Sequence, residues 1–179
     1  MFVKVCGLRN IDQANWAIEF GYDAIGVVVC KKSKRHCDEE IAKSIAEYAK
    51  GKVETFVVGL TLDDVKSVMG YFDTVQLYEQ VELDKLAFAS KYPPNRDLNY
   101  KYFFYDASIG AGTYSEFPDW LSSLSGKVVL AGGLNSQNIE SVIKKYSPFG
   151  VDVSSGVETS GIKDREKMRR FIEAVRRCE

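Results

Sequence analysis

The chain has 179 residues, of which 45% are hydrophobic and 27% are charged, an ordinary globular composition that is sufficient for one domain with a full core. Its formal net charge of −1 argues against a broad basic surface for nucleic acid, so an anionic ligand has to be bound locally. The sequence has no signal-peptide pattern and no apolar stretch as long as a membrane span, so we expect no membrane partner.

Short apolar runs alternate with helical patterns along the chain. Capping residues and glycines mark several helix ends, with Asn10 and Asp164 as candidate N-caps. The predicted elements, in chain order, are a strand over 2–6, a helix over 10–21, a strand over 24–29, a helix over 41–51, a strand over 53–60, a helix over 61–70, strands over 73–77, 101–106 and 127–132, a helix over 139–143, a strand over 151–153 and a helix over 164–175.

This alternation predicts βα units and a parallel sheet of the α/β class. Two architectures fit, a doubly wound open sheet and a closed (β/α)8 barrel. The first strand is not followed by a G-x-G-x-x-G motif, which disfavours a dinucleotide-binding sheet. No linker or change of composition divides the sequence, so we expect a single domain over residues 1–179.

Residues 78–101 are ambiguous. The stretch EQVELDKLAFASKY fits one helix with Val81, Leu86 and Ala89 facing inward. Alternatively, LAFAS is a short strand and the helix before it is reduced to a turn. Pro93 and Pro94 end either version, and periodicity does not distinguish the two.

Polar residues stand where predicted strands end, which is where the active site of a TIM barrel lies. Cys6 ends the first strand, Gln76 the fourth and Asp106 the sixth, while Arg35 lies in the cationic loop after the second. Alone, Cys6 reads more simply as a small buried residue, and Arg35 as part of a solvated loop. Asp106 follows three aromatic residues and is either a loop cap or a catalytic acid or base.

Two glycine-containing loops follow the last two strands. Their small residues expose backbone N–H groups that bind an anion such as phosphate, or they serve only as turns and helix caps. The candidate ligand-binding residues of these loops, together with the last strand, are Gly132, Gly133, Asn135, Asp152, Ser154, Ser155 and Gly156.

The cysteines do not indicate a metal centre. Cys6, Cys30, Cys37 and Cys178 have no CxxC spacing, and His36 is the one histidine in the sequence. We therefore expect no metal site, and a reduced, cytoplasmic protein.

Several separated motifs together resemble one known family. They are KVCGLRN (4–10), DAIGVVV (23–29), SKRH (33–36), VQL (75–77), YDAS (105–108), AGGLN (131–135), GVDVSSGVE (150–158) and GIKD (161–164). In this order the motifs resemble phosphoribosylanthranilate isomerases, which are enzymes of tryptophan biosynthesis. The resemblance covers nearly the whole chain and implies a (β/α)8 TIM barrel, here with one shortened βα unit around residues 78–101.

The resemblance also implies a reaction. It is the Amadori rearrangement of N-(5-phosphoribosyl)anthranilate to 1-(2-carboxyphenylamino)-1-deoxyribulose 5-phosphate, which needs no cofactor. By the same resemblance Asp106 is the general acid, Cys6 the general base and Arg35 the ligand of the anthranilate carboxylate, while Gly133, Ser154 and Ser155 hold the phosphate. We expect the pKa of Cys6 to be lowered so that the thiol can act as a base.

Departures from the family pattern keep two other functions open. Tyr78-Glu79 stand where relatives commonly have His-Gly, and the segment 78–101 is short for the family. A non-catalytic barrel that binds a phosphorylated metabolite is one alternative, and an isomerase of a related phosphorylated aminoaldose is another. The expected partner is a small phosphorylated substrate, and the expected assembly is a monomer or a homodimer.

Overall fold

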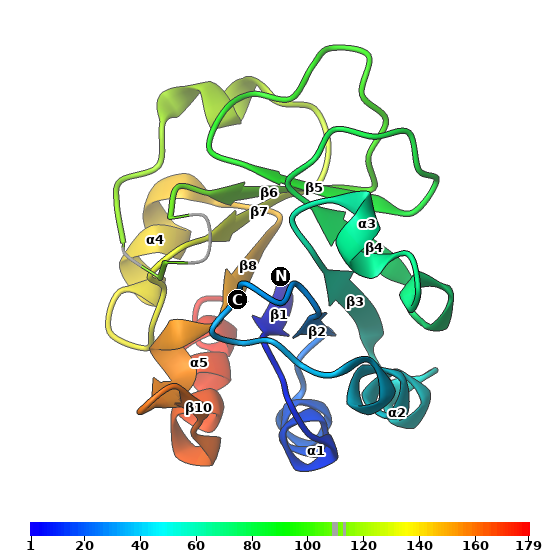
Figure 1. Cartoon of the computed structure of the whole chain (residues 1–179). Helices are drawn as coiled ribbons and strands as arrows, with labels where there is room; N and C mark the ends of the chain where they lie inside the picture. The colour runs from blue at the N-terminus through cyan, green and yellow to red at the C-terminus, as the bar shows by residue number, and fades with distance from the viewer. Residues whose placement is uncertain (109–110, 113) are drawn as a thin grey trace.

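Eight parallel strands close into a barrel in chain order (Figure 1). The structure is a computed structural model that describes residues 1–108, 111–112 and 114–179. Closure comes from β1 and β8, which pair with Phe2 opposite Gly150. The closed-barrel prediction is therefore confirmed. The strands are β1 Phe2–Cys6, β2 Ala24–Val28, β3 Glu54–Val58, β4 Thr74–Leu77, β5 Leu86–Ser90, β6 Tyr102–Asp106, β7 Val128–Ala131 and β8 Gly150–Val153.

Helices cover the barrel unevenly, gathering along the lower and left sides of Figure 1. Two of the predicted caps are formed: Asn10 accepts a hydrogen bond from the backbone of Gln13, and Asp164 accepts one from Lys167. The helices are α1 Ile11–Phe20, α2 Glu39–Ala49, α3 Leu62–Val65, α4 Ile139–Tyr146 and α5 Arg165–Arg176, with 3₁₀ turns η1 Met69–Tyr71, η2 Asp119–Ser123 and η3 Ser155–Val157 and a small hairpin of β9 Glu158–Thr159 and β10 Ile162–Lys163.

The ambiguous segment contains a strand. LAFAS forms β5, which pairs with β4 on one side and with β6 on the other. Residues 78–85 and 91–101, all of them described, contain no helix, so loops cover the barrel here. The strand alternative for LAFAS is confirmed, and the single-helix alternative is wrong.

The predicted helix over 61–70 is also wrong in extent, because α3 ends at Val65. The capping box of Thr61 and Asp64 is formed, but the chain then turns into η1. The Lys85 ammonium donates to the carbonyl oxygens of Met69 and Phe72 at the end of that turn. This tertiary contact satisfies carbonyl groups that a longer helix would bond internally.

The inside of the barrel is narrow and partly polar. Lys4 lies between the rings of Phe56 and Phe104, with its Nζ 5.3 Å and 5.0 Å from their centroids, and is completely buried. Gly26 makes room for this arrangement, since a Cβ there would lie 2.9 Å from the Cys6 sulfur and 3.1 Å from Lys4 Nζ. Residues of β1 that alternate along the strand, Lys4 and Cys6, therefore rise through the barrel toward its C-terminal end.

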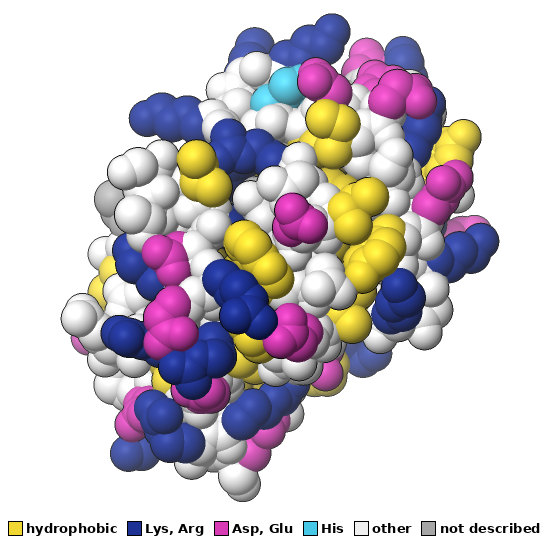
Figure 2. All heavy atoms as spheres, turned by 90° about the horizontal axis from the view of Figure 1, so that it is seen from below, with side chains coloured by type: hydrophobic (Ala, Val, Ile, Leu, Met, Phe, Trp, Pro, Cys, Tyr) yellow, Lys and Arg dark blue, Asp and Glu magenta, His cyan; other side chains and the backbone are white. Residues whose placement is uncertain are grey.

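The outer surface has mixed charge. Figure 2 shows positive and negative side chains interspersed over the side that carries α1, α2 and α5, with smaller hydrophobic areas between them. On α5, Arg169 pairs with Glu166 and Glu173. In the described part of the chain, no helix is both long and apolar enough to cross a membrane.

Candidate functional site

A cavity of about 550 Å³ opens at the C-terminal ends of the strands. Most of the predicted site residues line it, and they are brought together from six strands and the loops that follow them. Asn135 and Gly156 are the two predicted residues outside its lining. The predicted residues in the lining are Cys6, Arg35, Gln76, Asp106, Gly132, Gly133, Asp152, Ser154 and Ser155.

Cys6 lies at the top of β1 above a buried ion pair. Lys4 Nζ is 3.1 Å from Asp152 Oδ1, and both groups are on inward-facing positions of neighbouring strands. The Lys4 ammonium also interacts with Cys6 by charge and by hydrogen bonding. Burial opposes the charge on Lys4, but Asp152 and Cys6 outweigh it and raise the Lys4 pKa. The base of the cavity therefore holds a fixed positive charge beside the thiol.

The pKa of Cys6 moves in the direction opposite to our expectation. Burial raises it above the ordinary thiol value, and Lys4 and Lys163 offset only part of that effect. The expected lowering is therefore wrong for the ligand-free chain. Sequence reasoning placed Cys6 at a strand end but gave no measure of how little water reaches it, since its side chain is buried among inward-facing neighbours.

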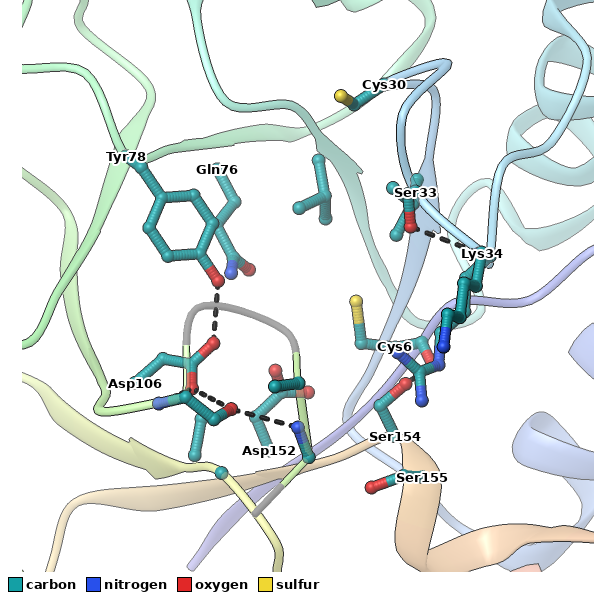
Figure 3. Close-up of a pocket in the computed structure, with 18 of the residues that line it drawn as sticks. Cys6, Cys30, Ser33, Lys34, Gln76, Tyr78, Asp106, Asp152, Ser154 and Ser155 are labelled. Atoms are coloured by element: carbon teal, nitrogen blue, oxygen red, sulfur yellow. Dashed lines mark hydrogen bonds between the residues drawn. The ribbon is translucent and has the colours of Figure 1, made fainter. Parts of the chain in front are cut away.

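Asp106 ends β6 and is held by short hydrogen bonds. Its Oδ1 accepts from the backbone N–H of Ser108 at 3.0 Å and from the Ser108 hydroxyl at 2.7 Å. Its Oδ2 lies 2.7 Å from the hydroxyl of Tyr78 (Figure 3). In this view Cys6 and Asp106 face the same space, and Asp152 lies between them. A carboxyl group and a thiol on one cavity can exchange protons with the same bound molecule.

Arg35 pairs with a carboxylate of its own chain. Its Nε and Nη2 contact the two oxygens of Glu158 at 2.8 Å and 3.0 Å, a bidentate geometry. Lys163 contacts Glu158 Oε1 at 2.6 Å and is almost fully buried. Burial opposes ionisation of Glu158, but Arg35 and Lys163 outweigh it and lower the Glu158 pKa. In the ligand-free chain Arg35 therefore pairs with Glu158, and its contact with the anthranilate carboxylate stays a prediction.

The two glycine-containing loops have separate roles in the lining. Gly132 and Gly133 have φ values of 97° and 66°, a left-handed backbone that favours glycine. The Ser154 hydroxyl donates to the carbonyl oxygen of Cys6 at 2.8 Å and accepts from Lys163 at 3.2 Å. Ser154 therefore ties the end of β8 to the end of β1, while Ser155 lies beside it in the lining.

Asn135 and Gly156 support the loops from behind. Asn135 Oδ1 accepts from the backbone N–H groups of Gln137 and Asn138, so it caps the turn before α4. A Cβ on Gly156 would lie 1.9 Å from the carbonyl oxygen of Leu134, so only glycine allows the two loops to touch. Their positions fit a role in shaping the cavity rim.

Gln76 has an unusual environment. Its side chain is buried on β4 and faces the cavity, and within the described residues its Oε1 has no hydrogen-bond partner. A buried amide oxygen without a partner is costly unless a ligand or water supplies a donor. Gln76 therefore remains a candidate for direct ligand contact. In the described part of the chain, no group of three or more His, Cys, Asp or Glu is placed to hold a metal ion.

Comparisons with known proteins agree on one family. The family model for N-(5'-phosphoribosyl)anthranilate isomerase matches residues 110–174. The isomerase of that name from Streptococcus mutans is 35% identical, over 98% of this chain and 98% of the relative. The chain belongs to the phosphoribosylanthranilate isomerase family.

Solved structures of the family superpose on the whole chain. The phosphoribosylanthranilate isomerase from Thermus thermophilus has a TM-score of 0.85 at 25% identity, with 100% of both chains covered. A family member in complex with reduced 1-(o-carboxyphenylamino)-1-deoxyribulose 5-phosphate has a TM-score of 0.74 at 30% identity, with 98% of both chains covered. The fold of these isomerases is therefore shared by this chain, in which residues 78–85 and 91–101 contain no helix.

Sequence reasoning missed four residues of the site in this family member. Lys4 was detectable, because it alternates with Cys6 on one strand and therefore shares its face. Tyr78 was noted only as a departure from the family pattern. Glu158 and Ser108 belong to the motifs 150–158 and 105–108, but the sequence did not indicate their roles, since each is defined by a contact with Arg35 or Asp106.

Proposed function

We propose that this chain catalyses the Amadori rearrangement of N-(5-phosphoribosyl)anthranilate to 1-(2-carboxyphenylamino)-1-deoxyribulose 5-phosphate. The observation that carries the proposal is the cavity itself, in which a thiol, a carboxyl group and an arginine share one lining. The reaction needs one proton donor and one proton acceptor close to the same sugar carbons. Cys6 and Asp106 supply those two groups.

The reaction begins with ring opening. Asp106 is the source of the proton that reaches the furanose oxygen as the bond between that oxygen and C1 breaks, which leaves a protonated Schiff base between C1 and the anthranilate nitrogen. Cys6, after it has released its thiol proton to solvent, takes the proton from C2 as the thiolate, and the electron pair forms the enolamine. Tautomerisation of the enolamine gives the ketone. Lys4, beside Cys6, stabilises the thiolate that the second step requires.

Other residues bind the substrate in this proposal. Arg35 holds the anthranilate carboxylate, and the backbone around Gly132 and Gly133 holds the phosphate together with Ser155. Gln76 donates or accepts a hydrogen bond at the sugar, and Asp152 acts through Lys4. Ser154, Asn135 and Gly156 fix the loops on which the phosphate contacts depend.

The proposal extends to the setting of the enzyme. We infer one catalytic domain over residues 1–179 that works without a metal or an organic cofactor, as a monomer or a homodimer in the cytoplasm. The substrate is a small phosphorylated molecule, and the net charge of −1 leaves no broad basic surface for nucleic acid.

The test follows the loss of anthranilate fluorescence from freshly generated phosphoribosylanthranilate. Wild type is expected to turn the substrate over, also after dialysis against a chelator, while Cys6→Ala and Asp106→Asn lose at least about a hundredfold in kcat. Tyr92→Phe, at a highly exposed position, is the matched control. A folded wild type without turnover would favour the non-catalytic barrel. Full activity of both site variants would overturn the assigned roles.

A further inference from the structure

Tyr78 reaches across one strand of the barrel to touch Asp106. Tyr78 directly follows β4, Asp106 ends β6, and β5 lies between them. Ala89 of β5 is small and belongs to the buried interior cluster against which Tyr78 packs. The Tyr78 Oη lies 2.7 Å from Asp106 Oδ2 (Figure 3).

Among the described residues, the donors to the two oxygens of Asp106 differ. Oδ1 accepts hydrogen bonds from the backbone N–H and from the hydroxyl of Ser108. An oxygen that accepts from two donors is a poor site for a further proton, because that proton would point at one of them. The protonated acid therefore carries its hydrogen on Oδ2, the oxygen that faces Tyr78.

This geometry directs the acidic proton at the phenol and away from the open cavity. When Asp106 is protonated, Oδ2 donates to Tyr78 Oη, and the hydrogen of Tyr78 turns to another acceptor. Tyr78 lines the cavity, so a molecule bound there can serve as that acceptor. When Asp106 is ionised, the direction reverses and Tyr78 donates to the carboxylate. The phenol remains neutral in both states, because burial and Asp106 raise the pKa of Tyr78 well above its ordinary value.

We propose that Tyr78 relays the proton of Asp106 to the ring oxygen of the phosphorylated sugar in the cavity. This inference rests on the proposed function of Asp106 as the acid. In one step the Asp106 Oδ2–H bond breaks as Tyr78 Oη gains that proton. The original Oη–H bond breaks as the ring oxygen gains its proton, and the C1–O bond electrons remain on that oxygen. Tyr78 ends neutral and donates to the new carboxylate, so no further reactant is needed.

Tyr78→Phe removes the relay and keeps the ring. Under single-turnover conditions we expect its rate to fall at least about tenfold while KM changes less than about twofold. Tyr92→Phe, far from the cavity lining, is expected to keep the wild-type rate. The rate in mixtures of H₂O and D₂O provides a readout that loss of packing would not move. Wild type should show one more proton in flight than Tyr78→Phe, as a more strongly curved dependence on the deuterium fraction.

The outcomes separate this inference from the proposed function. If wild type and Tyr78→Phe turn over within twofold of each other and Asp106→Asn does not, the relay is overturned and the acid assignment stands. If wild type has no activity, the proposed function fails first. If Tyr78→Phe does not fold, fluorotyrosine at position 78 replaces it, because it keeps the size and changes the acidity of the phenol. An unchanged rate with fluorotyrosine would also overturn the relay.

Discussion

The Cys6 thiol is buried beside the ammonium group of Lys4. Burial and the positive charge of Lys4 have opposing effects on the reactivity of the thiol. Burial disfavours the thiolate, whereas Lys4 favours it. Because burial dominates, the ligand-free protein holds Cys6 mostly as the neutral thiol near pH 7. The base is thus stored in its protonated form, and the positive charge that stabilises the thiolate is already in place.

The rate of Cys6 alkylation by iodoacetamide should therefore continue to rise at high pH. Since the Cys6 pKa is raised, the thiolate fraction is still growing at the ordinary thiol value of 9.0, and we expect the rate to keep rising above that pH. Peptide mass spectrometry separates Cys6 from Cys30, Cys37 and Cys178. A rate that levels off below pH 8 would show a lowered pKa and contradict the structure.

Replacing Lys4 tests two effects separately, its ion pair with Asp152 and its stabilisation of the Cys6 thiolate. Lys4→Met leaves Asp152 as a buried charge without its cation, which we expect to cost about 3–5 kcal/mol of unfolding free energy in urea. The double variant Lys4→Met/Asp152→Asn should regain most of that stability. Its kcat should stay at least about tenfold below wild type, because the thiolate has lost its cation. A stable double variant with full turnover would reduce Lys4 to a structural role.

Residues near the site differ in how far the sequence could predict them. Cys6 and Asp106 were found because strand ends and family motifs coincide there. Glu158 lies more than a hundred positions from Arg35 in the sequence, so no local pattern connects them. Tyr78 was visible as a residue but not as a partner of Asp106, since their contact joins strand ends that are 28 positions apart in the sequence.

The hairpin of β9 and β10 acts as an element that presents charge to the cavity rim. It carries Glu158 and Lys163 on adjacent strands, paired in register. Both side chains are largely buried, and Glu158 pairs with Lys163 and with Arg35 from the loop after β2. A small surface hairpin thus fixes an arginine that belongs to a distant loop.

Glu158→Gln removes the anion that two cations share. Arg35 and Lys163 then face each other without a carboxylate, so the guanidinium loses its fixed orientation. We expect KM for phosphoribosylanthranilate to rise at least about tenfold, with a smaller change in kcat, in steady-state fluorescence assays. Glu140→Gln, at an exposed ion pair, is the matched control. Unchanged KM in Glu158→Gln would show that Arg35 is positioned by other contacts.

The first turn of α5 depends on its cap. Asp164 accepts from the backbone of Lys167 and from the hydroxyl of Thr159, and these hydrogen bonds lower its pKa. Asp164→Ala should cost about 1 kcal/mol of unfolding free energy at pH 7 in urea. Because the folded-state pKa lies below the unfolded value of 3.8, this contribution is present above 3.8 and is lost as the pH falls below it. A difference that is independent of pH would exclude the charge as its source.

Elements of the fold were predicted where helix caps and apolar patterns agree. They were missed where closure of the barrel determines the conformation. Capped helices such as α1 and α5 and the apolar strands were recognised from their patterns. LAFAS was ambiguous, because five apolar or small residues fit either element. Its strand conformation follows from a non-local requirement, since β4 and β6 would otherwise both be open edges.

At the scale of the molecule, the barrel makes all eight strands one hydrogen-bonded ring. The side with few helices is part of the same ring as the side with many. No strand can unfold without breaking the hydrogen bonds on both of its edges. The side with few helices is therefore stabilised by its pairing with the helix-rich side. This arrangement supports the proposal of a single domain.

Unfolding should therefore occur in one step on both sides of the barrel. Trp16 lies on α1, on the helix-rich side, and Trp120 lies on η2, on the opposite side of the ring. In single-tryptophan variants, Trp16→Phe and Trp120→Phe, the fluorescence melts should give the same Tm as far-UV circular dichroism does for each variant. A separate, earlier transition reported by Trp120 would divide the molecule into two cooperative units.

Because β1 pairs with β8, the barrel cannot close until its last strand has been synthesised. Phe2 pairs with Gly150, so β1, the first of the eight barrel strands to be synthesised, waits for β8, the last of the eight, before its second edge is covered. Until then β1 and the newest strand are both exposed to pairing with other chains. Neighbouring strands of the barrel are consecutive in the sequence except for β1 and β8, which lie far apart in it. The nascent chain needs protection until that contact forms, whatever the stability of the finished barrel.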